Sequence, residues 1–388
     1  MIKLIKNVEV YMPEYIGKRD ILIAHDKISK IGDSITVTGI DVEVIDGKGK
    51  KALPGFIDSH VHITGGGGEG GYKTRTPEIV LSDIIKGGIT TIIGTLGTDG
   101  VTRSLENLYA KAKALEEEGV TTYIYTGAYR VPTVTFTGSI MKDLVLIDKV
   151  IGVGEIAISD HRSSQPNLEE LKRLTADARV AGILSGKAGV VNIHMGDGKD
   201  GLNKLIEIAE TTEIPITQFY PTHINRNPYL FEQGIQFAKM GGFIDFTTSS
   251  DPLFYDEGEV KASIALKTCI EKGLGDNITF TSDGQGSLPN FNEKGEFIGL
   301  KVGRVTSLFN EVRDAVLDGV QLEQAVKAIT SNPAKILKLK GKGKIYEGYD
   351  ADIVLVDEDY YVDTVISKGH LLMKNKKVIA MGTFEMGT

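Results

Sequence analysis

The sequence has very little cysteine: Cys269 is the single thiol in 388 residues. One thiol excludes an internal disulfide framework and a cysteine-based metal cluster. No apolar run approaches membrane-spanning length, and the first residues lack the apolar core of a signal peptide. The formal net charge of −8 argues against nucleic acid or an anionic membrane as a partner. We therefore expect a cytoplasmic protein, long enough for two structural domains.

Strand-like segments rich in β-branched residues, bounded by Gly, Asp and Pro, occupy both ends of the chain. Between them, eight strand candidates alternate with helical patterns. The candidates are residues 55–63, 89–96, 121–127, 150–159, 190–195, 215–223, 243–249 and 278–283. Eight such repeats predict an α/β protein with a (β/α)8 TIM barrel, whose working face lies at the carboxyl ends of its strands.

This change from strand-like ends to an alternating strand and helix pattern predicts three segments. Residues 1–53 and 346–388 form the two parts of a small β-sandwich that is discontinuous in sequence, and residues 54–345 form the metal-binding catalytic barrel. One helix of the barrel is especially clear, because Leu105, Leu108, Ala112 and Leu115 share one face and Gly119 is a plausible stop.

Four of the seven histidines fall near ends of predicted barrel strands. His60 and His62 lie near the end of the first strand, His194 near that of the fifth, and His223 near that of the sixth, while Asp283 ends the eighth. Strand residues i and i+2 share a face, so His60 and His62 can hold one ion together. Imidazole and carboxylate ligands suit zinc. A lone histidine is more often an ordinary core or surface residue, so the convergence at one rim carries this metal-site prediction.

The remaining histidines lie in flanking segments or in a loop and are left out of the site: His25, His161 and His370.

Several longer motifs add a family resemblance. "PGFIDSHVH", the strand-end histidines, the late aspartate and "TSNPAKILKLKGKGKIYEGYDADIVLVD" resemble the amidohydrolase superfamily of metal-dependent hydrolases. The chain is more closely similar to the isoaspartyl (β-aspartyl) dipeptidases of that superfamily. This closer resemblance rests on "HVHITGGGGEGG", "TRTPE", "GTLGTDG", "TGAYRVP", "AISDHRS", "HMGDG", "PTHINRN" and "SSDPL…TSDGQGS".

The resemblance implies an enzyme that hydrolyses β-aspartyl dipeptides with two divalent cations, zinc by expectation, bridged by a hydroxide. His60 and His62 would hold one cation together with Asp283, and His194 and His223 the other. Asp283 would act as the general acid and base.

The sequence departs from the family pattern at the group that bridges the metals, which in well-known members is a carbamylated lysine midway along the fourth strand. Here Glu155 aligns with that lysine, and the nearest lysine, Lys149, precedes the strand. Glutamate offers the same two oxygens on a shorter stem. The strand must therefore bulge inward, as Gly154 permits, or the metals must sit deeper. A surface position for Glu155 is disfavoured by its apolar neighbours.

The glycine-rich loop "TGGGGEGG" follows the first strand directly. Glycine lets backbone approach a ligand closely, so the loop can cover the metal site with backbone that no side chain shields. Glu69 would meet a substrate ammonium, and the resemblance adds a backbone contact from Gly67. A flexible linker is the alternative, which a position inside a compact barrel disfavours.

Arg162 and Arg226 follow the fourth and sixth strands, and the planar guanidinium matches a carboxylate with two hydrogen bonds. One acid and two arginines at the rim suggest a zwitterion with two carboxylates. The β-linkage itself comes from the resemblance, which also implies polar contacts from Thr98 and Ser287 and an oxyanion hydrogen bond from Tyr129.

Two other hypotheses stay open. One is another amidohydrolase, such as a cyclic amidase (dihydroorotase or hydantoinase) or an N-acyl-amino-acid deacylase, which would not need Glu69 and both arginines. The other is a metal-free scaffolding relative, which would lack several ligands. We also expect a homo-oligomer, although no sequence feature sets the number of subunits.

Overall fold

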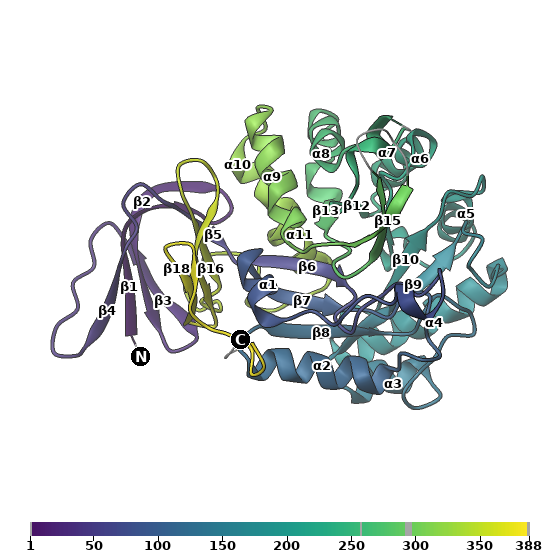
Figure 1. Ribbon diagram of the computed structural model, residues 1–388, viewed down its shortest axis with the longest axis horizontal. Coiled ribbons are helices and arrows are strands. Elements are labelled where there is room, and N and C mark those ends of the chain that lie inside the picture. Colours follow the sequence, from purple (N-terminus) through teal and green to yellow (C-terminus); the bar gives the residue numbers. More distant parts are fainter. Residues whose placement is uncertain (1, 257, 292–296, 386–388) are drawn as a thin grey trace.

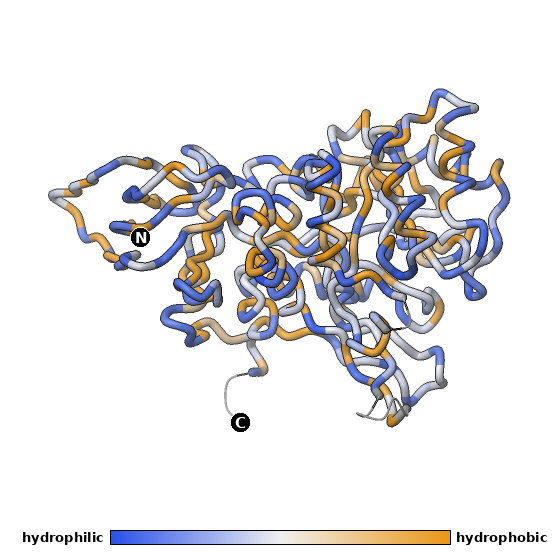
Figure 2. Tube along the Cα trace, turned by 90° about the horizontal axis from the view of Figure 1, so that it is seen from above, coloured by the Kyte–Doolittle hydropathy of each residue, from blue (hydrophilic) through white to orange (hydrophobic). Residues whose placement is uncertain are grey.

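The computed structural model describes residues 2–256, 258–291 and 297–385. Residues 1 and 386–388 of the predicted terminal segments lie outside the described residues, as do residues 257 and 292–296 of the predicted barrel. The described chain forms a narrow lobe from its two ends and a broad lobe from its middle (Figure 1). Figure 2 shows both lobes from above, with hydrophobic stretches running through each.

Eight parallel strands form the barrel of the broad lobe, which confirms the predicted (β/α)8 fold. They are β6 (Phe56–Val61), β7 (Ile89–Gly94), β8 (Thr121–Thr126), β9 (Val150–Ile158), β10 (Val190–Met195), β11 (Phe219–Thr222), β12 (Ile244–Thr247) and β13 (Ile278–Thr281). Strands β6 to β11 pair in order, and β12 pairs with β13. Just beyond β11, Ile224 N donates to Asp245 O of β12 at 3.1 Å, and Val61 of β6 bridges Gly284 beyond β13, so the ring closes.

Helices follow the strands around the barrel. They are α1 (Leu81–Lys86), α2 (Leu105–Glu117), α3 (Ile140–Leu146), α4 (Leu168–Ser185), α5 (Asn203–Thr211), α6 (Pro228–Lys239), α7 (Pro252–Asp256), α8 (Ala262–Glu271), α9 (Ser307–Leu317), α10 (Leu322–Ala325) and α11 (Ser331–Ile336). Short 3₁₀ helices occur at Tyr72–Thr74, Ile216–Gln218, Gly275–Asn277 and Val326–Ile329. A hairpin of β14 (Ser287–Phe291) and β15 (Phe297–Val302) follows β13.

Helix α2 shows how local sequence sets these elements. Ser104 caps its first turn by accepting a hydrogen bond from Asn107 N, as serine commonly does at this position. Its buried residues are the four predicted on one face: Leu105, Leu108, Ala112 and Leu115. The chain turns at Gly119, where φ is 115°, a backbone conformation that favours glycine.

All the predicted barrel strands except residues 190–195 are shorter in the structure than expected, and two of these differences affect the site. The 3₁₀ helix Ile216–Gln218 replaces the start of the sixth strand, which begins at Phe219. The eighth strand ends at Thr281, because the backbone N–H of the next residue, Ser282, donates to the side-chain oxygen Asp58 Oδ1 at 3.2 Å. Asp283 therefore lies two residues beyond the strand, with a φ of 51°.

The two ends of the chain form one sheet, which confirms the predicted β-rich lobe from both termini. Its strands are β1 (Ile2–Tyr11), β2 (Tyr15–Ala24), β3 (Lys27–Gly32), β4 (Val42–Asp46), β5 (Lys51–Pro54), β16 (Ile353–Val356), β17 (Val362–Ser367), β18 (His370–Lys374) and β19 (Lys377–Val378). The order is β19-β18-β17-β16-β5-β1-β2-β3, with β4 beside β1.

This sheet folds back on itself instead of forming two separate sheets. Ile28 N, on β3, donates to Tyr349 O at 2.9 Å, and Ala351 N donates to Asp26 O at 2.7 Å. The sheet thereby encloses its own core, which includes Ile5 and Ile353. The change from this sheet to the barrel falls between β5 and β6, beside the expected boundary at residue 53, and the division into domains stays a prediction.

A separate apolar cluster joins residues from β6 to β11 to residues of α11 and the chain just after it, among them Tyr125, Tyr220 and Leu337. It fills part of the barrel, and the catalytic end of such barrels is the opposite one, at the carboxyl ends of the strands. Among the described residues, no helix combines the length and the apolar character needed to cross a membrane.

Candidate active site

A cavity of about 480 Å³ opens at the carboxyl ends of the barrel strands. Eleven of the thirteen predicted site residues line it: His62, Gly67, Glu69, Thr98, Tyr129, Arg162, His194, His223, Arg226, Asp283 and Ser287. The other two, His60 and Glu155, are 0% and 1% exposed and contact the lining histidines. All thirteen residues therefore belong to one assembly.

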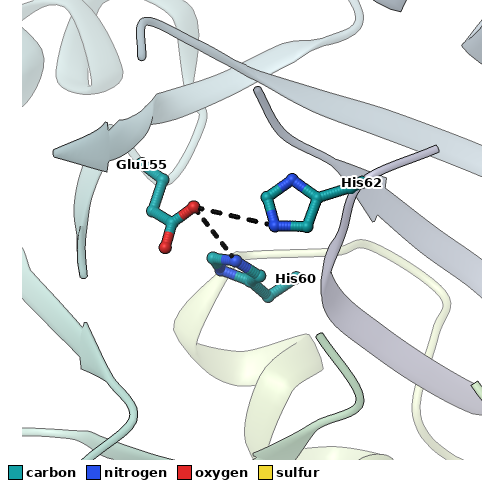
Figure 3. A group of neighbouring side chains, drawn as sticks. All are labelled: His60, His62 and Glu155. Atoms are coloured by element: carbon teal, nitrogen blue, oxygen red, sulfur yellow. Dashed lines mark ion pairs between the residues drawn. The ribbon is translucent and has the colours of Figure 1, made fainter. Parts of the chain in front are cut away.

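The four predicted histidine ligands surround the Glu155 carboxylate (Figure 3 shows His60 and His62). Glu155 Oε2 lies 3.3 Å from His60 Nε2 and 4.0 Å from His62 Nε2. Glu155 Oε1 lies 2.7 Å from His194 Nδ1 and 3.4 Å from His223 Nε2. Each oxygen of one carboxylate thus faces its own pair of imidazoles.

Asp283 joins the first of these pairs. Its Oδ1 lies 3.0 Å from His62 Nε2 and 3.7 Å from His60 Nε2. Two groups of potential ligands, His60–His62–Glu155 and Glu155–His194–His223, have ligand atoms within 4.8 Å of one another. Both groups share Glu155, which is the geometry that a bridging carboxylate requires.

Strand β9 carries the bulge that the short glutamate side chain needs. Its pairing with β10 changes register, so that residues 154 and 155 lie opposite Asn192 alone. A bulge of this kind re-aims a side chain. Gly154 has a φ of 154°, and a Cβ there would lie 2.8 Å from both Asn192 Cβ and Asn192 O. Only glycine fits this position without displacing β10.

Hydrogen bonds on the far ring nitrogens orient two of the histidines. His60 Nδ1 lies 3.1 Å from Asn192 Oδ1, and His223 Nδ1 lies 2.5 Å from Thr247 Oγ1. These contacts turn both Nε2 atoms toward Glu155. Partners of this kind fix the ring orientation of metal-binding histidines.

The electrostatics of the cluster favour a cation. Burial alone would raise the pKa of the Glu155 carboxyl, but His60 and His194 hold that pKa well below its usual range. Burial lowers the pKa of the His60 imidazole, yet the Glu155 carboxylate outweighs this effect and raises it to about 10. Burial lowers the pKa of His223 to about 3, which leaves a neutral imidazole suited to metal binding.

Three buried polar atoms at the centre of the cluster have the chemistry and the unpaired state that suit a metal ion. His60 Nε2, Glu155 Oε2 and Asp283 Oδ1 are buried without a hydrogen-bond partner in the described part of the chain. Buried polar atoms are costly to leave unpaired, and nitrogen and carboxylate oxygen together suit zinc and similar cations. A divalent cation would satisfy all three.

On the substrate side of the cavity, Glu69 contacts two of the other predicted polar residues. Thr98 Oγ1 donates to Glu69 Oε1 at 2.8 Å, and Arg162 Nη1 lies 3.4 Å from the same oxygen. The Tyr129 hydroxyl lies 2.9 Å from His194 Nδ1, and burial holds the pKa of the Tyr129 phenol well above its usual range. Tyr129 therefore keeps its proton near neutral pH and can donate it in a hydrogen bond.

Known proteins share this architecture. Residues 235–372 match the model of the Amidohydrolase family. A dihydroorotase of Bacillus cereus (strain B4264) is 25% identical over 90% of this chain and 88% of its own. The crystal structure of the β-aspartyl dipeptidase from thermophilic, keratin-degrading Fervidobacterium islandicum AW-1, in complex with a β-Asp-Leu dipeptide, is 56% identical. It covers 97% of this chain and 98% of its own, with a TM-score of 0.90.

The chain belongs to the β-aspartyl dipeptidase family. A second crystal structure of the Fervidobacterium islandicum AW-1 protein is similar at 54% identity, over 97% of this chain and 98% of its own, with a TM-score of 0.90. Members of this family are metal-dependent amidohydrolases, so this chain is a metal-dependent hydrolase, as predicted.

Sequence reasoning missed four residues that position this β-aspartyl dipeptidase site: Arg103, Asp160, Asn192 and Thr247. Asn192 precedes His194 by two residues on β10, and this i, i+2 spacing was a usable signal. Asp160 precedes Arg162 by two residues in "SDHRS", which belongs to one of the motifs that carry the family resemblance. The role of Arg103 carries no local signal, because it depends on contacts with carbonyls 27 to 39 residues away.

Arg103 holds the glycine-rich loop that carries Gly67 and Glu69. Its guanidinium donates to Gly66 O at 3.0 Å and to Thr76 O at 3.1 Å, and it also donates to Thr64 O. Arg103 is 6% exposed. One buried side chain therefore ties together both ends of the loop.

We predict that Arg103→Met loosens this loop, since three carbonyls lose their donor. Losing about 1.5 kcal/mol of hydrogen bonding corresponds to roughly tenfold more frequent local opening. Limited trypsin digestion after Lys73 and Arg75 should speed up by that factor. Arg173→Met, at an exposed position on α4, is the control and should leave the rate unchanged. Equal cleavage of Arg103→Met and the wild type would contradict this role.

Proposed function

We propose that this protein hydrolyses β-aspartyl dipeptides, using two divalent cations, zinc by preference. The charge pattern of the cavity is the observation that carries the proposal. Glu69 offers an anion to a substrate ammonium, and Arg162 and Arg226 offer two cations to substrate carboxylates. A β-aspartyl dipeptide has this complement: one ammonium and two free carboxylates. The related Fervidobacterium islandicum AW-1 protein, crystallised with β-Asp-Leu, supports the assignment.

In this proposal Glu155 is the shared ligand of the two cations. His60, His62 and Asp283 complete one ligand set, and His194 and His223 complete the other. The two oxygens of Glu155, each facing one pair of histidines, support this division. When bound, the cations would polarise the scissile carbonyl and lower the pKa of the attacking water.

Asp283 moves the proton. Burial would raise the pKa of its carboxyl, but His62 and the other nearby histidines hold that pKa well below its usual range. The carboxylate is therefore ionised near neutral pH and can take the proton of the attacking water. Asp283 then returns this proton to the leaving amine, which completes general acid–base catalysis.

Tyr129 stabilises the developing oxyanion with its phenolic proton. Glu69 and the backbone at Gly67 hold the ammonium, with Thr98 fixing the Glu69 carboxylate at 2.8 Å. Arg162 and Arg226, with Ser287, hold the carboxylates. These contacts place the amide carbonyl above the histidine cluster, and effective positioning alone contributes several kcal/mol to catalysis.

Replacing Glu155 tests the bridge. We expect Glu155→Gln to bind fewer than two zinc ions per chain and to lose more than about a hundredfold in activity, because the amide cannot ligate two cations as the carboxylate does. Glu232→Gln, on the exposed face of α6, is the control. Elemental analysis, after dialysis of the protein against a zinc-containing buffer, measures the number of zinc ions per chain. Two zinc ions and full activity in Glu155→Gln would refute the bridge.

A substrate panel tests the specificity. We expect hydrolysis of β-Asp-Leu, with at least about a hundredfold lower kcat/KM for α-Asp-Leu, dihydroorotate and an N-acetyl amino acid, because these leave buried polar groups of the site unpaired. Glu69→Gln should raise KM for β-Asp-Leu. Equal rates on the two aspartyl dipeptides would defeat the assignment, and faster hydrolysis of dihydroorotate would favour the cyclic amidase.

We also propose that the protein works as a homo-oligomer in the cytoplasm. Exposed apolar side chains on the neighbouring helices α3 and α4 support self-association; they are Val145, Leu146, Val180, Ile183 and Leu184. Light scattering of the purified protein should give a multiple of the 42.0 kDa chain mass. A monomeric mass at micromolar concentration would contradict this proposal.

A further inference from the structure

We propose that Asp160 is a positioning residue that holds Arg162 and His194 at the same time, and so couples substrate binding to metal binding. This inference rests on the proposed function, in which Arg162 meets a substrate carboxylate and His194 a cation. In this inference Asp160 itself binds neither the substrate nor a cation. Its importance follows from the two side chains that its carboxylate connects.

The contact with Arg162 is a paired one. Arg162 Nε donates to Asp160 Oδ1 at 2.9 Å, and Arg162 Nη2 donates to Asp160 Oδ2 at 2.6 Å. The backbone N–H of Arg162 also donates to Oδ1 at 2.7 Å. This bidentate pair, together with the backbone bond, leaves the guanidinium little freedom to rotate.

This clamp aims Arg162 into the cavity. The remaining nitrogen, Nη1, donates to Glu69 Oε1 at 3.4 Å, and the guanidinium carbon lies 5.5 Å from the centre of the Tyr129 ring. Asp160 itself is 5% exposed. Asp160 therefore neutralises half-buried Arg162 from behind and leaves its outer edge for a substrate carboxylate.

The same carboxylate reaches the imidazole of His194. Asp160 Oδ2 lies 3.0 Å from His194 Nε2, on the opposite side of the ring from Nδ1, which lies 2.7 Å from Glu155 Oε1. A neutral imidazole carries one N–H. If Nε2–H donates to Asp160, the lone pair of Nδ1 points at the cluster, as a metal ligand requires. Carboxylates in this position fix the tautomer and raise the basicity of the ligating nitrogen.

Two readings of Asp160 differ in what they predict. If Asp160 only neutralises Arg162, its loss affects substrate binding alone. If it also orients His194, its loss weakens metal binding as well, even with no substrate present. Asp160→Asn separates them, because the amide keeps the shape but is uncharged and has one acceptor oxygen, whereas Arg162 and His194 together use both oxygens of Asp160.

The experiment compares the full-length, zinc-loaded wild type with three variants. We expect Asp160→Asn to weaken zinc binding by about 10- to 100-fold, measured by chelator competition without substrate, and to raise KM for β-Asp-Leu at least tenfold. Arg162→Ala should raise KM similarly but leave zinc affinity within about twofold. Asp177→Asn, exposed on α4, should change neither. The split between the two site variants is the signature of coupling.

Unchanged zinc affinity in a folded Asp160→Asn protein would overturn the proposal, and so would equal zinc loss in Arg162→Ala. Circular dichroism of each variant checks the fold. If Asp160→Asn does not fold, Asp160→Glu, which keeps the charge on a longer stem, serves in its place; it should still weaken zinc binding and raise KM, with a smaller loss of zinc affinity than the 10- to 100-fold expected of Asp160→Asn. Failure of the wild type to hydrolyse β-Asp-Leu would defeat the proposed function alone, because the zinc comparison needs no substrate.

Discussion

One carboxylate among four imidazoles is the constraint on which this site depends. Glu155 is 1% exposed, and each of its oxygens faces a different pair of histidines. A glutamate side chain reaches this point because β9 bulges at residues 154 and 155. The bulge in turn needs Gly154, whose missing Cβ leaves room for Asn192 on β10. Backbone geometry thereby brings a short glutamate side chain to the centre of the histidines.

The barrel brings the remaining groups to the same place. Its strands are parallel and neighbouring, so their carboxyl ends meet at one rim, where loops far apart in sequence become adjacent. The hydrogen bond from His62 N to Gly284 O, 2.9 Å long, joins the first strand to the last. This closure places Asp283 beside His62. The buried cluster, the rim and the substrate-side residues consequently form one continuous structure, with Asp160 linking the metal side to the Arg162 side.

Much of this arrangement was readable from the sequence, for physical reasons that can be named. The histidine spacing and the amphipathic pattern of α2 both depend on local periodicity, so the sequence alone could point to them, and the buried face of α2 is the predicted one. The terminal sheet folds back on itself, and β11 begins later in the chain than predicted. Both features depend on long-range contacts, which local patterns do not encode. Arg103 escaped notice for the same reason: its partners are loop carbonyls, whose identity the sequence does not reveal.

The most direct test is a crystal structure of the zinc-loaded protein, with anomalous diffraction recorded at the zinc edge. The account predicts two peaks about 3.5–4 Å apart, with one oxygen of Glu155 on each and His60 and His194 on different ions. A single peak, or two peaks with Glu155 bound to neither, would contradict it.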